Sequence, residues 1–181
     1  PEGLKVTLFA APPDIGYPAC LAAAPTGELF VGVDENSSLD QERGRGRIIR
    51  CADVDNDGRA DQFTLFVDQL DSPRGMCFVG RTLYVLHPPY LTAFQDRDGN
   101  GIADHSEVLV RGFGFDLNFR GADHTTNGIR MGIDGWIYVA VGDYGLVKAV
   151  AKDGSQLRLH GGGIVRVRHD GSEIELFARG L

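Results

Sequence analysis

The chain has 181 residues, of which 43% are apolar and 24% charged, and its formal net charge is −7. This composition is typical of a globular domain that can bury a core. The acidic balance and the lack of a basic stripe argue against nucleic-acid binding. No apolar run approaches the ~18 residues that a membrane-spanning helix needs. The chain opens on Pro-Glu-Gly without a signal segment, so we expect a processed or trimmed product.

The predicted elements are short strands separated by turns, and they repeat along the chain. Glycine is frequent, with 25 residues, and helical periodicity is scarce, which favours an all-β fold. In three strands an aromatic residue holds the same place, at Phe30, Tyr84 and Tyr138, so the steps are 54 residues long. A period near 50 that is built only of strands and turns indicates a β-propeller.

Each repeat is predicted to form one blade of four antiparallel strands. The blades span about residues 17–70, 72–112 and 124–181, and a strand at 4–10 is predicted to close the ring. Three blades and one strand do not make a ring, since propellers have four to eight blades. We therefore predict a single partial propeller domain over 1–181, belonging to a six-bladed ring in a longer protein.

The connections of such blades fall on two faces. Two long insertions, Asp34–Arg45 and Asp143–Gly162, are interpreted as surface loops. In an up-and-down blade these loops share a face with the segments that carry Arg74 and His124. The loops between the third and fourth strands of each blade lie on the opposite face.

The three cysteines lack the spacing of zinc or c-type haem sites. Cys20, Cys51 and Cys77 are interpreted as small buried core residues. A Cys20–Cys77 bridge is the alternative, because both lie in equivalent inner strands. Cysteine usage therefore leaves the redox compartment open.

Two acidic loops occupy the same position in the first two blades. Both fit the pattern D-x-D-x-[DN]-G-x-x-D, whose oxygen ligands and glycine turn suit Ca²⁺. Only the second loop has the glutamate at position 12. An Asp-rich solvated turn is the alternative, and the place opposite His124 favours a structural ion. The predicted ligands are Asp53, Asp55, Asp57 and Asp61 in the first loop, and Asp96, Asp98, Asn100, Asp104 and Glu107 in the second.

A polar cluster at 123–127 is the best candidate for catalysis. His124 can take a proton from an alcohol at neutral pH, and Asp123 can orient the substrate or the imidazole. Asn127 can orient a bound ligand, and Arg74 suits an anionic cofactor. The structural alternatives are a histidine that holds loops together and an arginine that forms an ion pair between blades.

These residues resemble a known family. Ala122-Asp123-His124, Asn127–Arg130, Asp134–Tyr138 and Val141-Gly142-Asp143 are similar to segments of the glucose/sorbosone dehydrogenases, which are PQQ-dependent, calcium-containing six-bladed propellers. Over its whole length the chain resembles the propeller module of PVC-type membrane-bound dehydrogenases, including Ser72-Pro73-Arg74-Gly75.

The resemblance implies PQQ-linked oxidation of a sugar or other alcohol. His124 would be the general base and Asp123 a substrate contact. Arg74, Asn127 and Asp143 would lie at the cofactor. It further implies a periplasmic or extracellular bacterial location and an electron-accepting cytochrome domain outside this chain. The alternatives are a non-catalytic calcium-stabilised propeller that binds glycan or protein, and a lactonase-like metal hydrolase.

Overall fold

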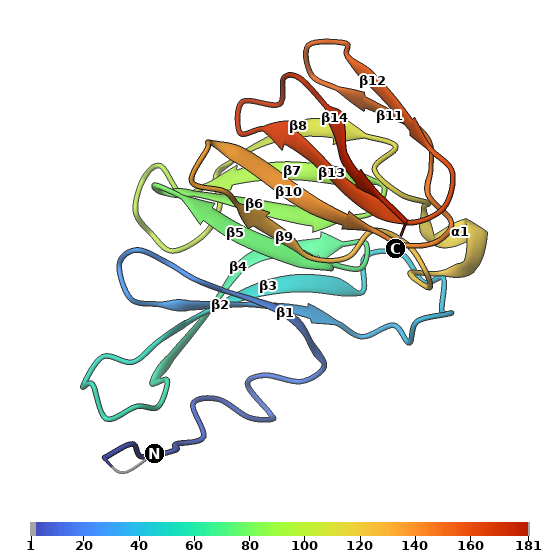
Figure 1. The fold of residues 1–181 in the computed structure, drawn as a ribbon. Helices are drawn as coiled ribbons and strands as arrows, with labels where there is room; N and C mark the ends of the chain where they lie inside the picture. The colour runs from blue at the N-terminus through green and yellow to red at the C-terminus, as the bar shows by residue number, and fades with distance from the viewer. Residues whose placement is uncertain (1–2, 181) are drawn as a thin grey trace.

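The computed structural model describes residues 3–180, and its regular structure is almost entirely β. Three antiparallel sheets lie side by side as blades (Figure 1). The predicted all-β fold with four-stranded antiparallel blades is therefore confirmed. No helix in 3–180 is long and apolar enough to cross a membrane. Leu181, the last residue of the third predicted blade, lies outside the described residues.

The strands of each blade follow one another closely along the chain. Blade one contains β1 Pro18–Ala23, β2 Leu29–Asp34, β3 Gly46–Ala52 and β4 Gln62–Leu70. Blade two contains β5 Gly75–Val79, β6 Thr82–His87, β7 Tyr90–Gln95 and β8 His105–Arg111. Blade three contains β9 Ile129–Met131, β10 Trp136–Val141, β13 Gly163–Arg168 and β14 Glu175–Arg179.

The core lies between the blades. One cluster, which includes Phe30, Ile48 and Val85, joins blades one and two, and a second, which includes Leu86, Ile137 and Val165, joins blades two and three. Strand β6 of blade two lies between β5 and β7, is covered on both faces and therefore carries a continuous apolar run.

The interpretation of Asp143–Gly162 as a surface loop is wrong. This insertion forms a hairpin of β11 Leu146–Ala151 and β12 Gln156–Leu159. β11 pairs with β8 through Val150↔Arg111 and Ala151↔Val110, so the sheet of blade two has six strands. Apolar side chains of the hairpin, Leu146, Ala149 and Leu159, are buried in the core between blades two and three.

The segment at 4–10 forms no strand. It lies against blade one and its acidic loop, where Phe9 O accepts from Ala60 N at 2.9 Å and Thr7 Oγ1 donates to Gly58 O at 3.0 Å. Phe9 also packs on the free face of blade one. No described strand lies alongside to pair with it, so ring closure by this segment stays a prediction.

All three cysteines are free thiols, so the Cys20–Cys77 bridge is not formed. Each packs in a different apolar cluster: Cys77 between blades two and three, Cys20 between blades one and two, and Cys51 on the free face of blade one. Burial raises the pKa of Cys77 to about 11, which keeps this thiol protonated and unreactive.

Gly75 of β5 lies close against the backbone of blade three. A Cβ at this position would lie 2.9 Å from Gly128 Cα and 2.9 Å from Ile129 N, which are backbone atoms of the next blade. The adjacent hydrogen bond from Gly128 N to Arg74 O, at 3.0 Å, holds the inner strands together.

The substitution Gly75→Ala is expected to lower the free energy of unfolding by about 1–3 kcal/mol, because backbone atoms must move to admit the methyl group. Urea unfolding of the intact protein measures this loss. Gly16→Ala is the matched control, since that position has an ordinary φ and open space around it. Equal stabilities of the two variants would contradict the close approach.

His87, at the end of β6, is buried, and its Nε2 lies 2.8 Å from Thr92 Oγ1. Burial lowers the pKa of His87 to about 4, although the charge of Asp71 acts in the opposite direction. The unfolded chain therefore binds more protons than the native protein between pH 6.5 and 4. Stability is lost as the pH falls through this window.

From pH 7 to pH 5 the wild type is expected to lose about 2 kcal/mol more than His87→Gln. Urea unfolding at the two pH values gives the difference. Glutamine can still bond to Thr92 but does not titrate, so it isolates the protonation effect. Equal losses would show that the folded protein does not hold His87 neutral.

Candidate functional site

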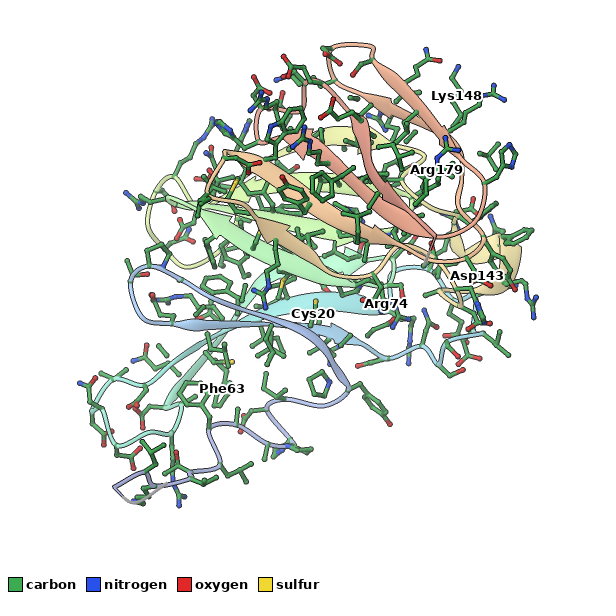
Figure 2. The ribbon with its side chains drawn as sticks, in the orientation of Figure 1. Cys20, Phe63, Arg74, Asp143, Lys148 and Arg179 are labelled. Carbon is green, nitrogen blue, oxygen red and sulfur yellow. The ribbon has the colours of Figure 1, made fainter. Side chains whose placement is uncertain are left out.

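The site lies at the end of the blades where the long loops gather. Helix α1, Leu117–Arg120, marks this end, and the acidic loops lie at the opposite one (Figure 1). Figure 2 shows Arg74 and Asp143 directed toward the α1 end. The strand directions therefore place the candidate residues as the sequence predicts. Loop 35–45 joins the same region through Ala122 N, which donates to Ser38 O at 2.9 Å.

His124 is held by two neighbours. Its Nδ1 lies 2.5 Å from Asp143 Oδ1, and its Nε2 lies 3.6 Å from Asp123 Oδ2. Since a carboxylate only accepts, Nδ1 must donate to Asp143, and in the neutral ring Nε2 is left as the acceptor. The His124 side chain is 50% exposed, so Nε2 can be reached by a substrate hydroxyl.

The backbone around His124 is firmly fixed. His124 has φ of 53°, a left-handed conformation that costs energy in a non-glycine residue. The buried Thr126 donates to Phe113 O at 2.8 Å, and the buried Thr125 accepts from Phe115 N at 3.3 Å. Gly142 N donates to Thr125 O at 3.2 Å, which ties the strand end that bears Asp143 to the loop that bears His124.

An aromatic cluster lies beside the histidine, and the sequence interpretation missed it. Tyr144 stacks on His124 with ring centroids 5.1 Å apart, and Phe119 of α1 meets Tyr144 edge-on at 5.7 Å. The position of Tyr144 directly after Asp143 is a signal that could have found it. Nothing local in the sequence indicates that Phe119 comes close.

Arg74 lies in a network that joins blades one and two. Its Nη2 is 3.0 Å from Oδ2 of the buried Asp34, and Ser72 Oγ donates to the same oxygen at 2.6 Å. The structural alternative for Arg74 is thus observed. The Nε of Arg74 is buried and has no hydrogen-bond partner among residues 3–180.

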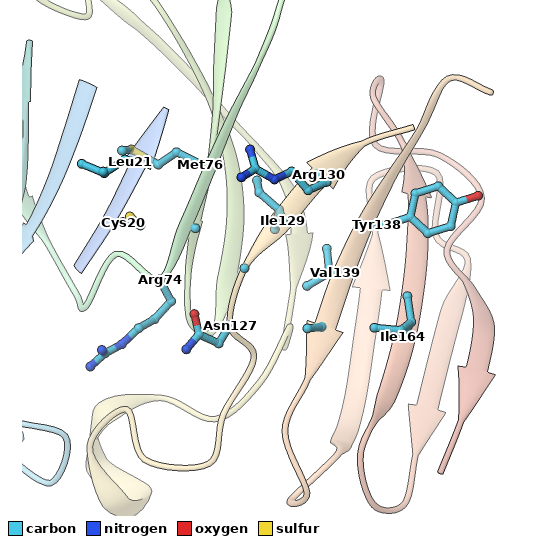
Figure 3. A pocket seen from close by; sticks show the side chains of 13 residues that line it. Cys20, Leu21, Arg74, Met76, Asn127, Ile129, Arg130, Tyr138, Val139 and Ile164 are labelled. Carbon is cyan, nitrogen blue, oxygen red and sulfur yellow. The ribbon is translucent and has the colours of Figure 1, made fainter. Parts of the chain in front are cut away.

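A pocket of about 390 Å³ opens among the inner strands β1, β5 and β9. Arg74 and Asn127 lie at one end of it, and Arg130 lies toward the other (Figure 3). Backbone of Gly75 and Gly128 and the side chain of Ile129 form much of the wall between them. His124, Asp123 and Asp143 do not belong to the lining. The predicted residues therefore form two neighbouring groups. One contains Asp123, His124 and Asp143, and the other contains Arg74 and Asn127.

The acidic loops share one hydrogen-bond pattern. Position 6 N donates to the first aspartate in both: Gly58 N to Asp53 Oδ2 at 2.9 Å and Gly101 N to Asp96 Oδ2 at 2.8 Å. In each loop three carboxylates have oxygens within 4.8 Å of one another; they are Asp53, Asp55 and Asp61, and Asp96, Asp98 and Asp104.

The remaining predicted ligands have other partners in the structure. Glu107 lies in β8 and pairs with Lys152 at 2.6 Å, because the strand carries it away from the loop. Asp57 and Asn100, at position 5, accept from the backbone two residues further on, Arg59 N and Ile102 N, both at 2.8 Å.

Asp96 shows how such a loop stays charged. Burial would raise the pKa of this carboxyl, but the N–H groups of Gly101 and Gly99 act in the opposite direction and lower it below its usual value. A group of ionised carboxylates at this distance repel one another, and a cation between them would relieve the repulsion.

Two solved structures resemble this chain over part of their own length. Regucalcin from Agrobacterium tumefaciens, described as a calcium-binding protein, matches with 21% identity and a TM-score of 0.52, over 79% of this chain and 45% of its own. A glucose dehydrogenase-type oxidoreductase from Thermus thermophilus matches with 22% identity and a TM-score of 0.48, over 82% of this chain and 44% of its own.

The fold and the blade pattern make this chain part of a β-propeller. It belongs to the family described as "Domain of unknown function (DUF7133)", whose model matches residues 1–180. The chain spans less than half the length of the two solved structures above. A search of curated proteins gives no match.

Proposed function

We propose that the protein oxidises a sugar or another alcohol, with His124 as general base and PQQ as hydride acceptor. The observation that carries this proposal is the His124–Asp143 pair at 2.5 Å, which leaves Nε2 free beside Asp123. Such a pairing fixes the tautomer of a catalytic histidine and stabilises its protonated form.

In this proposal the chain's own residues move the proton. The substrate hydroxyl would donate its hydrogen bond to His124 Nε2 and pass its proton there. Asp123 accepts a hydrogen bond from a neighbouring hydroxyl. Asp143 then faces an imidazolium rather than a neutral ring, so the pair strengthens as the proton arrives. This role differs from the cofactor contact expected of Asp143.

The residues around Arg74 fit an anionic part of PQQ. The unpartnered Nε of Arg74 and the amide of Asn127 lie at the same end of the pocket (Figure 3). Both can donate to a carboxylate, and the burial of Arg74 Nε strengthens its contact. When bound, PQQ would supply a quinone that accepts the hydride. Export to the periplasm and transfer of electrons to a cytochrome domain outside this chain belong to the same proposal.

A titration of the intact protein with PQQ in the presence of Ca²⁺, followed by dye reduction with a panel of aldoses, tests the function. His124→Ala is expected to keep PQQ binding but to lose at least about 100-fold in turnover, because the base is gone. His160→Ala, which removes another exposed histidine, is expected to change neither.

If wild-type protein does not bind PQQ, the dehydrogenase proposal fails. The next candidate is then a calcium-stabilised propeller that binds glycan or protein on the His124 face. The pairing of Arg74 with Asp34 favours that candidate, because it gives Arg74 a structural role.

We further propose that each acidic loop binds a structural Ca²⁺ through its three clustered aspartates. The support is the repeated geometry of two independent loops at one blade position. Oxygen ligands from a glycine-containing turn suit this hard cation. The loops lie at the end of the blades opposite α1, so the ions would stabilise the fold rather than take part in the chemistry at His124 (Figure 1).

Removal of calcium with EGTA is expected to lower the melting temperature of the intact protein by several degrees, since an ion that binds only the native state stabilises it. The double variant Asp55→Ala/Asp98→Ala is expected to lose this dependence. Asp68→Ala, an exposed aspartate outside both loops, is the matched control and should keep it. An unchanged melting temperature of the wild type in EGTA would contradict the structural ions.

A further inference from the structure

A second pocket lies on the face opposite His124, between blades one and two. Its volume is about 380 Å³. The turn between β1 and β2 and the turn between β5 and β6 form two of its sides, and the second acidic loop contributes Asp96, Gly99 and Gly101. None of these residues belongs to the proposed catalytic or PQQ site.

The floor of this pocket is aromatic. The ring of Phe30 meets those of Phe66 and Phe78 edge-on, with both pairs of centroids 4.9 Å apart. Phe30 and Phe66 are each only 5% exposed, so the rings are fixed by packing from both blades. A rigid apolar floor of this kind binds a flat ring with little loss of side-chain entropy.

The carboxylates at the rim of this pocket already have hydrogen-bond partners within the protein. Glu28 binds Arg50 through Nη2 at 2.5 Å and Nε at 3.1 Å, and it also accepts from Thr26. Burial would raise the pKa of Glu28, but the bonds from Thr26 and Arg50 outweigh it and lower the pKa below its usual value. Asp96 is engaged by the backbone of its own loop, including Gly99 N at 2.7 Å.

The two arginines at the rim, in contrast, keep N–H groups that have no hydrogen-bond partner among the described residues. Arg50 Nη1 makes no hydrogen bond within residues 3–180, and it lies 3.2 Å from the point that a Cβ of Gly101 would occupy. Arg81, in the turn between β5 and β6, forms no ion pair among the described residues. The unused hydrogen-bonding capacity of the rim is therefore cationic.

We propose that this pocket binds a small organic anion that carries a flat apolar ring. The ring lies on Phe30, Phe66 and Phe78, and the carboxylate or a similar anionic group accepts from Arg81 and Arg50 Nη1. This site is independent of PQQ and of His124. It would add ligand recognition to a face that the proposed chemistry does not use.

Isothermal titration calorimetry of the intact protein, at constant calcium, tests the site with naphthalene-2-carboxylate and its neutral counterpart naphthalene-2-methanol. The acid is expected to bind with one-to-one stoichiometry and at least about tenfold more tightly than the alcohol, because a charged hydrogen bond contributes about 1.5–3 kcal/mol. Equal affinities for the two compounds would overturn the proposal.

Variants locate the bound acid. Arg81→Glu is expected to weaken it by at least about tenfold, and Ala24→Phe, which fills the pocket, to abolish it. Arg59→Gln, which removes an exposed arginine from the other acidic loop, should have no effect. Melting curves show whether each variant is folded. Unchanged binding in both Arg81→Glu and Ala24→Phe, or loss of binding in Arg74→Gln, would place the ligand elsewhere and refute this site.

Discussion

The pocket that holds Arg74 and Asn127 depends on the close approach of β5 to β9 at Gly75. Only a residue without a Cβ lets the two inner strands come this close, and the bond from Gly128 N to Arg74 O then fixes their register. Asn127 is one residue before this contact, and Arg74 is part of it. The same contact therefore closes the core between two blades and sets the two polar side chains of the pocket side by side (Figure 3).

Strand direction then separates the functions that we propose for the two faces. Antiparallel strands return every second connection to the same end of a blade, so the loops with His124 and Asp143 meet at one end and the acidic loops at the other (Figure 1). A charge at an acidic loop is screened from His124 by the length of the blades and by solvent. Calcium in these loops would consequently act through the stability of the blades.

The sequence predicted the blades well because their signals are local and repeated. The aromatic residues at Phe30, Tyr84 and Tyr138 mark equivalent strands, and glycine turns such as Asp134-Gly135 separate strand pairs. The sequence-based prediction failed for β11 and β12, because the repeat period assigned only four strands to each blade. Asp153-Gly154 is nevertheless a hairpin signal of the same kind as Asp134-Gly135. The partner strand of this hairpin, β8, belongs to the preceding blade, and no local pattern indicates such a pairing.

In the candidate site, too, local sequence patterns did not predict contacts between residues from different elements. The sequence indicated Asp143 as a site residue near the cofactor, but it did not identify Asp143 as the partner of His124 Nδ1, because that contact depends on how β10 ends beside the loop. Glu107 fits the spacing of a calcium ligand, yet its strand directs it to Lys152. Spacing therefore identifies carboxylates that cluster within one turn, such as Asp53, Asp55 and Asp61. Partners that come from different strands are fixed by pairing and register, and these depend on the whole fold.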